Sequence, residues 1–379
     1  MRDSASAWNP MKLLFRLIFY LAVLAGSSIS GFLVLRAALA QQTGSIAAEH
    51  LILFMPSERT SLGRELIADV ERCYDFMNRA TNGSLPKKVF ITVSWDQPES
   101  SCNRREASIT IGMSQPAAET DARGYLFHSA SREIARLGLL ELSQGAQRED
   151  TEFLFEGMIE ILVHEFDHSS RSLEAAWTLS KYLDEMQQLG LGAQRTWSSF
   201  SGGKRCLRSA APGITFLTTF RELQGRERAT KLFEALRKNS LLESLNTAFR
   251  APVADLESTW LKRVREYRIP DEITMKADTA PRLLQTVFPV ETGKPGTPLQ
   301  VRLFIENRAR NLLPDGVFVR DSRTGRLLQA QSAAEKSAAF LIATIPIEAN
   351  CPPGQYPYEV TAIDESGNLR RWNSAYTVR

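Results

Sequence analysis

The sequence predicts an α+β protein in two parts: a small sheet with a helical bundle, followed by an all-β sandwich. Three observations lead to this prediction. Strand-like segments surround one long helical stripe between residues 50 and 113, helical periodicity dominates from about 117 to 268, and apolar residues alternate with period two after about 283. The chain has 379 residues, and at about 100–200 residues per domain this length allows two domains and an appendage.

The first part begins with a strand, a helix and two further strands. Apolar residues recur at helical spacing between Leu62 and Met77, whereas the segments on either side are apolar or rich in β-branched residues. Pro56 ends the first strand, and Asn82-Gly83 breaks the helix. The elements expected here are a strand at 50–55, a helix at 60–80, and strands at 87–95 and 107–113.

One of the helices that follow has the residue spacing of a zinc-binding helix but lacks its ligands. In such a helix, two histidines four residues apart project from one face, and a glutamate beside the first acts as general base. Arg132 and Arg136 occupy the two histidine positions here, and Glu133 occupies the position of the base. Glu156 follows twenty residues after Arg136, and Glu160 lies one turn later. These are the places of a third ligand and of a carboxylate that orients a ligand.

The two motifs, SREIARLGL and FLFEGMIE, resemble those of the gluzincin, or peptidase MA-like, family, whose fold is thermolysin-like. In that family HExxH is followed by a helix that commonly reads W-x-x-E-G-x-A-E. The resemblance implies a degenerate peptidase MA-like domain over residues 47–269. It also implies that Glu133 corresponds to the general base, Glu156 to the third zinc ligand and Glu160 to the orienting carboxylate. The chain departs from the family at both histidines.

Arginine in place of the histidines predicts a vestigial site without catalytic function. A guanidinium group has no lone pair to offer and stays protonated, so Arg132 and Arg136 cannot bind zinc and would repel it. We therefore expect no metal and no cofactor here. Buried carboxylates close together are costly, and bidentate hydrogen bonds from the arginines would neutralise Glu133, Glu156 and Glu160. The alternative is a surface helix with scattered charges and an accidental REIAR.

A second motif offers an alternative zinc site. His164, Glu165 and His168 form a literal H-E-x-x-H, which would make the protein an active zinc metallopeptidase. Against this interpretation, Asp167 places a charge inside the motif, and no E-G-x-A-E-like segment follows it. The resemblance also places this segment directly after the glutamate helix, where a second zinc helix has no counterpart.

The N-terminus, residues 1–42, is predicted to be a signal peptide or a membrane anchor. Basic residues precede the uncharged stretch 17–35, which nearly spans a hydrocarbon core of about 30 Å. The basic flank predicts that the rest of the chain is exported. Residues 38–40 read Ala-Leu-Ala, a cleavage pattern. An uncleaved transmembrane helix, which would make the membrane a partner, and a cleaved signal remain equal alternatives.

The chain contains four cysteines, and none of them forms a C-x-x-C pair, which argues against a cysteine zinc site. Cys73 and Cys102 could form a disulfide in an oxidising compartment, because both fall in the first half of the same expected domain. The alternative is four free or buried thiols, with Cys206 and Cys351 as the other two.

The last part, residues 283–379, is expected to be the β-sandwich, joined by a linker at 270–282. The stretch PPGQYPYEVTAIDESGN resembles the last hairpin of bacterial immunoglobulin-like modules, which implies an Ig-like spacer or adhesive surface. Turn sequences such as Pro-Asp-Gly and Pro-Gly separate its strands. The strands expected are 299–306, 316–321, 338–347 and 356–364.

Together these observations favour an exported pseudoenzyme on the periplasmic or extracellular side of a bacterial envelope. It would bind an unidentified peptide or protein ligand, or act as an envelope scaffold. The net charge of +3, with both signs interspersed, gives no reason to expect nucleic acid as a partner. The alternative function is zinc-dependent peptide hydrolysis at the second motif.

Overall fold

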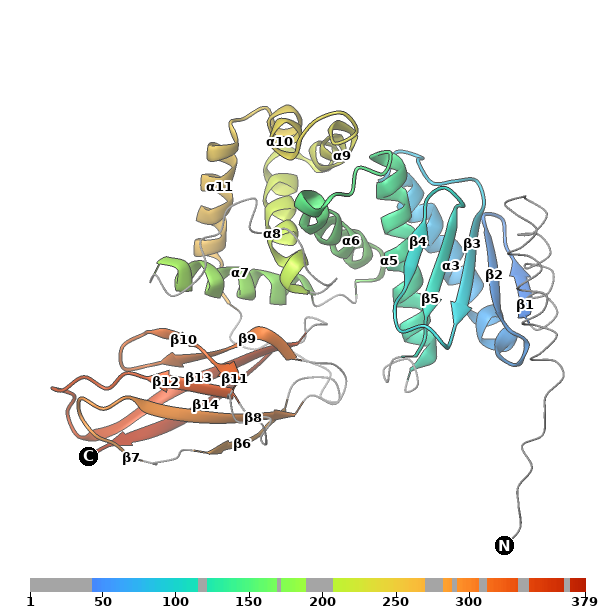
Figure 1. Ribbon diagram of the computed structural model, residues 1–379. Helices are drawn as coiled ribbons and strands as arrows, with labels where there is room; N and C mark the ends of the chain where they lie inside the picture. Colours follow the sequence, from blue (N-terminus) through green and yellow to red (C-terminus); the bar gives the residue numbers. More distant parts are fainter. Residues whose placement is uncertain are drawn as a thin grey trace, which may run out of the picture.

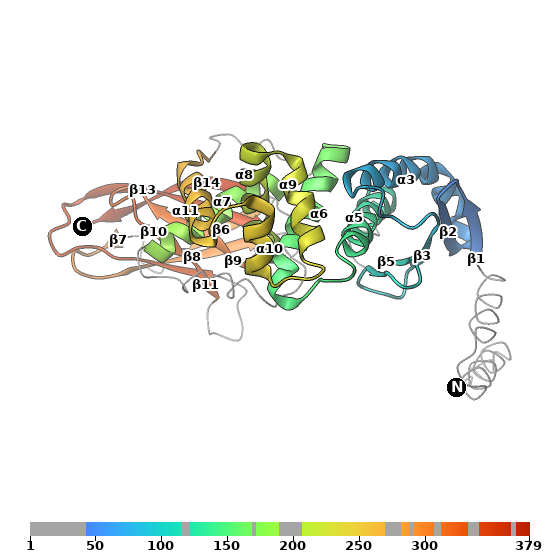
Figure 2. The same cartoon turned by 90° about the horizontal axis from the view of Figure 1, so that it is seen from above.

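The computed structural model has α+β architecture, as the sequence predicts (Figure 1). It describes residues 43–114, 121–168, 172–188, 207–269, 282–287, 292–306, 312–332, 341–364 and 369–379. Seen from above, the arrangement is elongated: the N-terminal sheet lies at one end, the helices in the middle and the C-terminal sheets at the other end (Figure 2).

The N-terminal sheet has five strands in the order β1-β2-β3-β5-β4. The three inner strands are parallel, and the two edge strands are antiparallel to their neighbours. The inner strands are the three expected from the sequence, whereas both edge strands were missed. The strands are β1 (Thr43–Ala47), β2 (Leu51–Pro56), β3 (Val89–Ser94), β4 (Ser101–Asn103) and β5 (Ser108–Gly112).

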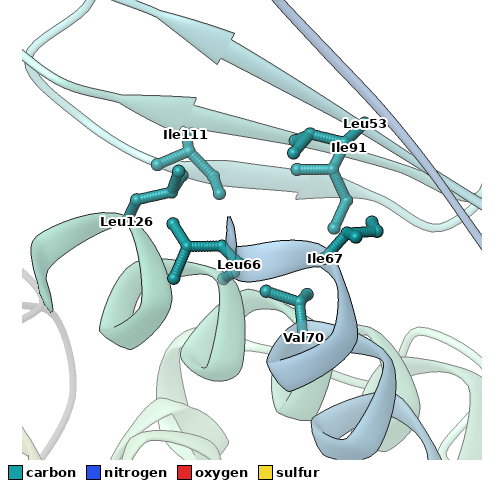
Figure 3. Close-up of a pocket in the computed structure, with 8 residues that line it drawn as sticks. Leu53, Leu66, Ile67, Val70, Ile91, Ile111 and Leu126 are labelled. Carbon is teal, nitrogen blue, oxygen red and sulfur yellow. The ribbon is translucent and has the colours of Figure 1, made fainter. Parts of the chain in front are cut away.

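Two long helices, α3 (Thr60–Ala80) and α5 (Ala122–Leu142), pack against this sheet, and η1 (Ser57–Arg59) precedes α3. Aliphatic side chains from the sheet and both helices meet there, as Leu66, Ile91 and Leu126 illustrate (Figure 3). They leave a cavity of about 10 Å³ with an entirely apolar lining. An apolar gap of this size is a packing defect and offers no polar partner for a ligand.

The central helices pack around α6, which contacts both α5 and α8. The core formed by the sheet and the first helices continues through α6 into α8, α9, α10 and α11. The arrangement therefore holds α6 between the N-terminal layers and the rest of the bundle. The elements are η2 (Glu149–Thr151), α6 (Glu152–Asp167), α7 (Ser172–Gln188), α8 (Leu207–Gln224), α9 (Arg226–Ala235), α10 (Leu241–Phe249) and α11 (Val253–Glu266).

The C-terminal strands form two sheets, ordered β10-β9-β13-β14-β7 and β11-β12-β8-β6. Buried side chains from both sheets share one core, in which Val301, Val319, Ile345 and Val360 take part. The immunoglobulin-like assignment stays a prediction. The strands are β6 (Arg282–Val287), β7 (Thr292–Gly293), β8 (Leu299–Glu306), β9 (Leu312–Asp321), β10 (Leu327–Gln329), β11 (Gln331–Ser332), β12 (Leu341–Ile345), β13 (Gly354–Asp364) and β14 (Leu369–Val378).

Helix α7 joins the helical part to the first of these sheets. Tyr182 stacks edge-on against Phe318 with ring centroids 4.9 Å apart, and its hydroxyl lies 3.3 Å from the Thr361 hydroxyl. Arg320 donates two hydrogen bonds to the carboxylate of Glu185, at 2.9 and 3.0 Å. This contact combines a buried apolar centre with a bidentate ion pair, and it fixes the β-sheets to the helical part.

In the described ranges, no helix is both long enough and apolar enough to cross a membrane. The expected signal or anchor at 1–42, with its apolar stretch 17–35, lies outside those ranges, as does most of the expected linker at 270–282.

Candidate functional site

The five residues that the sequence singled out as a degenerate zinc motif lie on the facing sides of α5 and α6. Residues four apart on a helix share a face, so Arg132 and Arg136 project together from α5, and Glu156 and Glu160 project together from α6. Glu133 lies beside them on α5. We call these five side chains the Arg–Glu cluster.

Glu156 lies at the centre of the Arg–Glu cluster. Arg132 Nη2 donates to Glu156 Oε2 at 3.0 Å, and Arg136 Nη1 donates to Glu156 Oε1 at 2.6 Å. Arg132 also pairs through Nη1 with Glu160, and Arg136 Nε donates to Glu133 Oε2 at 3.2 Å. Each oxygen of Glu156 thus accepts from a different guanidinium group, and the two arginines connect all three carboxylates.

The cluster is dry at one end and reaches solvent at the other. The side chains of Arg136 and Glu156 are each 1% exposed, whereas that of Arg132 is 21% exposed. Salt screens buried charges less than exposed ones, so we expect salt to weaken the pair between Arg136 and Glu156 least.

The charge of Arg136 is compensated locally. Burial lowers the pKa of Arg136, but the carboxylates of Glu156 and Glu133 raise it by more, so the net effect is a pKa above the usual value for arginine. Arg136 therefore stays protonated at any pH at which the protein is folded. One of its nitrogens, Nη2, is buried without a hydrogen-bond partner in the part of the chain that the structure describes.

The donor set of the cluster does not fit a zinc ion. Arg132 and Arg136 are permanent cations, and both oxygens of Glu156 already accept hydrogen bonds from them. A metal would have to displace two guanidinium groups from a buried carboxylate and would then find only oxygen ligands. Across the described ranges, no group of three or more His, Cys, Asp or Glu side chains is arranged to hold a metal ion.

The second motif is split by the end of α6. His164 and Glu165 belong to the last turn of the helix, but His168 follows it as a left-handed cap with φ of 53°. The two imidazole rings lie 6.4 Å apart, nearly perpendicular. The Glu165 carboxylate accepts from Arg221 at 2.8 and 3.0 Å and lies 3.1 Å from Arg226 Nη2. Glu165 is thus held by two arginines, whereas a general base needs a free oxygen that faces the water it activates.

The sequence did not predict that Arg221 and Arg226 would pair with Glu165. They lie on α8 and at the start of α9, and Arg221 is 56 positions away from Glu165. No local spacing could connect residues so far apart, because their contact depends on how α8 packs against α6.

The described cysteines are free thiols. Cys73 is buried in α3, Cys102 is half-buried on β4, and Cys351 is buried. The structure therefore does not form the disulfide between Cys73 and Cys102 that the sequence allowed. Cys206 lies outside the described ranges.

Cys73 is expected to be unreactive in the native protein. Burial raises the pKa of its thiol to about 12, against a smaller opposite effect of its hydrogen bond with Ser131. At pH 8 only about one thiol in ten thousand would be ionised, and the thiolate is the reactive form. Iodoacetamide labelling followed by peptide mass spectrometry should modify Cys102 well before Cys73, which should react only in denaturant. Equal labelling of both thiols in the native state would contradict this.

No protein-family model matches the chain, and no curated protein matches it. Among solved structures, it is similar to the S-layer protein rSbsC(31-844), with 11% identity and a TM-score of 0.15 over 83% of this chain and 45% of that one. It is also similar to the N-terminal part of the bacterial S-layer protein SbsC, with 13% identity and a TM-score of 0.16 over 83% of this chain and 79% of that one. The chain thus spans less than half of the first of these structures. TM-scores this low carry no argument about fold or function.

Proposed function

We propose that this protein is an exported, membrane-tethered pseudo-peptidase of the gluzincin type that acts in binding or as an envelope scaffold. The observation that carries the proposal is the Arg–Glu cluster. Its arginines hold the three carboxylates that a zinc peptidase of this type would use for catalysis and metal binding. The site would therefore keep its shape through internal ion pairs where a related enzyme uses a metal.

The order of the elements supports the gluzincin part of the proposal. A small mixed sheet precedes α5, which carries the altered zinc motif, and α6 follows with the two glutamates that the resemblance assigns to the next helix. The two C-terminal sheets around a common core support an immunoglobulin-like spacer, and that inference rests on architecture alone.

The chemistry of the cluster argues against peptide hydrolysis. A general base must accept a proton from an activated water, but Glu133 already accepts a hydrogen bond from Arg136. Glu133 is also buried, so a substrate would not reach it without rearrangement of the arginines.

Metal analysis of the purified full-length protein tests this proposal. After incubation with zinc and removal of excess metal, we expect no stoichiometric zinc in the wild-type protein. In the double variant Arg132→His/Arg136→His, the first motif becomes HExxH, and we expect about one zinc ion per chain with Glu156 as the third ligand. The additional change Glu156→Gln in that variant should weaken zinc binding.

Two outcomes would count against the proposal in different ways. Stoichiometric zinc in the wild-type protein that is lost in His164→Ala/His168→Ala would favour the alternative, an active metallopeptidase using the second motif. Failure of the histidine double variant to gain zinc, with an unchanged circular dichroism spectrum, would argue that α5 and α6 do not have the geometry of a gluzincin site.

A further inference from the structure

The N-terminal sheet has one face that helices cover and one face without charge. Helices α3 and α5 lie on the same side of the sheet (Figure 1), where they bury Leu53, Ile91 and Ile111. Alternate residues of the same strands point the other way, because successive side chains of a strand take opposite faces. None of the five strands contains an Asp, Glu, Lys, Arg or His residue. We call the side opposite the two helices the outer face of the sheet.

The outer face combines apolar and hydroxyl side chains. Ile52 and Phe54 of β2 alternate with its buried residues and so point outward, and Ala47 of β1 lies opposite Ile52. Ile52 and Phe54 are half-buried, yet they belong to none of the hydrophobic clusters in the described ranges. Thr92 of β3 lies next to Phe54 and is exposed. A solvated sheet face usually carries polar residues, so these two large apolar side chains favour a further contact.

The chain enters β1 from the segment that the proposed function places in the membrane. Seven residues, 36–42, separate the uncharged stretch 17–35 from Thr43 at the start of β1. An extended chain spans at most about 3.3–3.6 Å per residue, so the tether keeps Thr43 within about 25 Å of the hydrocarbon. The headgroup layer takes up about 5–8 Å of this distance. The outer face measures about 17 Å along the strands and about 19 Å across them, so a tether of this length holds it beside the bilayer.

The rim of the outer face carries both signs of charge. Lys87 is exposed before β3 at one end of the sheet, and Glu58 and Asp96 are exposed at the end where the chain enters. Arg59 lies at that same end, with its guanidinium 5.7 Å from the centre of the Trp95 ring. Tryptophan is enriched at membrane–water interfaces. A zwitterionic headgroup offers a phosphate to the cations and an ammonium to the carboxylates, whereas an anionic headgroup would be repelled by Glu58 and Asp96.

We propose that the outer face of the N-terminal sheet docks on the surface of the membrane that holds the chain, against zwitterionic phospholipid headgroups. The proposal rests on the membrane tether of the proposed function. Ile52 and Phe54 enter the headgroup layer, and because no strand residue is charged, the contact takes no charge of the sheet out of water. Docking holds the sheet end of the elongated molecule at the membrane (Figure 2).

Fluorescence quenching on the full-length protein in phosphatidylcholine vesicles tests the proposal. An NBD fluorophore is attached to Thr92→Cys on the outer face, and a small share of the lipid carries a nitroxide quencher on its headgroup. The control is the same label on Lys262→Cys, because Lys262 is 76% exposed on α11, away from the N-terminal sheet (Figure 1). We expect at least about twofold stronger quenching at position 92, since only a label that reaches the headgroup layer, about 5–8 Å thick, meets the nitroxide.

Two further variants make the test specific. Both labels are attached in the background Cys102→Ser/Cys206→Ser, because the two cysteines that remain are buried and closed to the reagent in the native state. Ile52→Asp in the labelled protein places a charge on the outer face, so quenching at position 92 should fall to the level at position 262.

Equal quenching at the two positions, or quenching at position 92 that Ile52→Asp leaves unchanged, would overturn the proposal. Stronger quenching in phosphatidylglycerol vesicles would overturn the choice of a zwitterionic headgroup. Chemical cross-linking of chains in pairs, without quenching, would assign the outer face to a second copy of this chain.

The premise of a tether is tested separately by intact-mass measurement. A chain that begins at Gln41 has no tether, and the proposal is then wrong. None of these results bears on zinc binding by the Arg132→His/Arg136→His variant, so failure here is distinguishable from failure of the proposed function at the Arg–Glu cluster.

Discussion

Replacement of Glu156 by alanine is expected to lower the free energy of unfolding by about 3–5 kcal/mol, because it removes one partner of a buried ion pair and leaves the other charge uncompensated. Arg136 is 1% exposed and, among the residues that the structure describes, would keep only its hydrogen bond to Glu133. A guanidinium group stays protonated in proteins, so Arg136 cannot shed the charge to relieve the cost. Arg132 is 21% exposed and can turn to water, which limits the loss at that side.

Urea denaturation followed by circular dichroism measures this effect. Glu156→Gln keeps the shape and one acceptor but removes the charge, so we expect a smaller loss than for alanine. Glu227→Ala serves as the control, because its side chain is 89% exposed and surface ion pairs contribute about 0–1 kcal/mol. A Glu156→Ala protein as stable as that control would mean that the Arg–Glu cluster is solvated, and it would contradict the proposal that the arginines take the place of a metal.

The Arg–Glu cluster could be predicted because it depends on local spacing. Arg132 and Arg136 share a helix face by periodicity alone, and the resemblance of the two motifs to those of gluzincins implied that Glu156 lies opposite them. The contact between Glu165 and Arg221 could not be predicted in this way. It joins α6 to α8 across a long, strongly helical stretch, and nothing in either helix specifies which residues of the other it will meet.

Among the strands, those with a clear local pattern could be predicted, and those without one could not. The alternation in LQVRLFIE predicted β8 with its observed bounds, Leu299–Glu306. β14 was missed because LRRWNSAYTV lacks clean alternation, and only Leu369, Tyr376 and Val378 of its residues are buried. Its ten-residue pairing with β13, from Gly354 to Ile363, compensates for that weak pattern. β4 is only three residues long, and β1 follows directly after the apolar N-terminus, so neither carries a readable period.

Gly157, the glycine of the EGMIE motif, packs directly against another glycine on α8. A Cβ atom on Gly157 would lie 2.4 Å from the carbonyl carbon of Gly213. A Cβ atom on Gly213 would lie 1.9 Å from the carbonyl oxygen of Phe153. Backbone atoms cannot rotate away as side chains do, so both positions require glycine for the close approach of α6 and α8.

Gly213→Ala is therefore expected to destabilise the protein by about 3 kcal/mol or more, at or above the upper end of typical overpacking effects. The added methyl group must push α6 and α8 apart, and α6 also carries Glu156, so Arg136 would lose packing and hydrogen-bond geometry together. Thermal and urea denaturation measure the loss. Gly138→Ala is the matched control in α5: its Cβ would lie 3.0 Å from Thr81 Oγ1, a side-chain atom that can yield, and alanine gains about 1 kcal/mol of helix propensity. If both variants are equally stable, the backbones of α6 and α8 do not approach each other as closely at Gly157 and Gly213 as the structure shows.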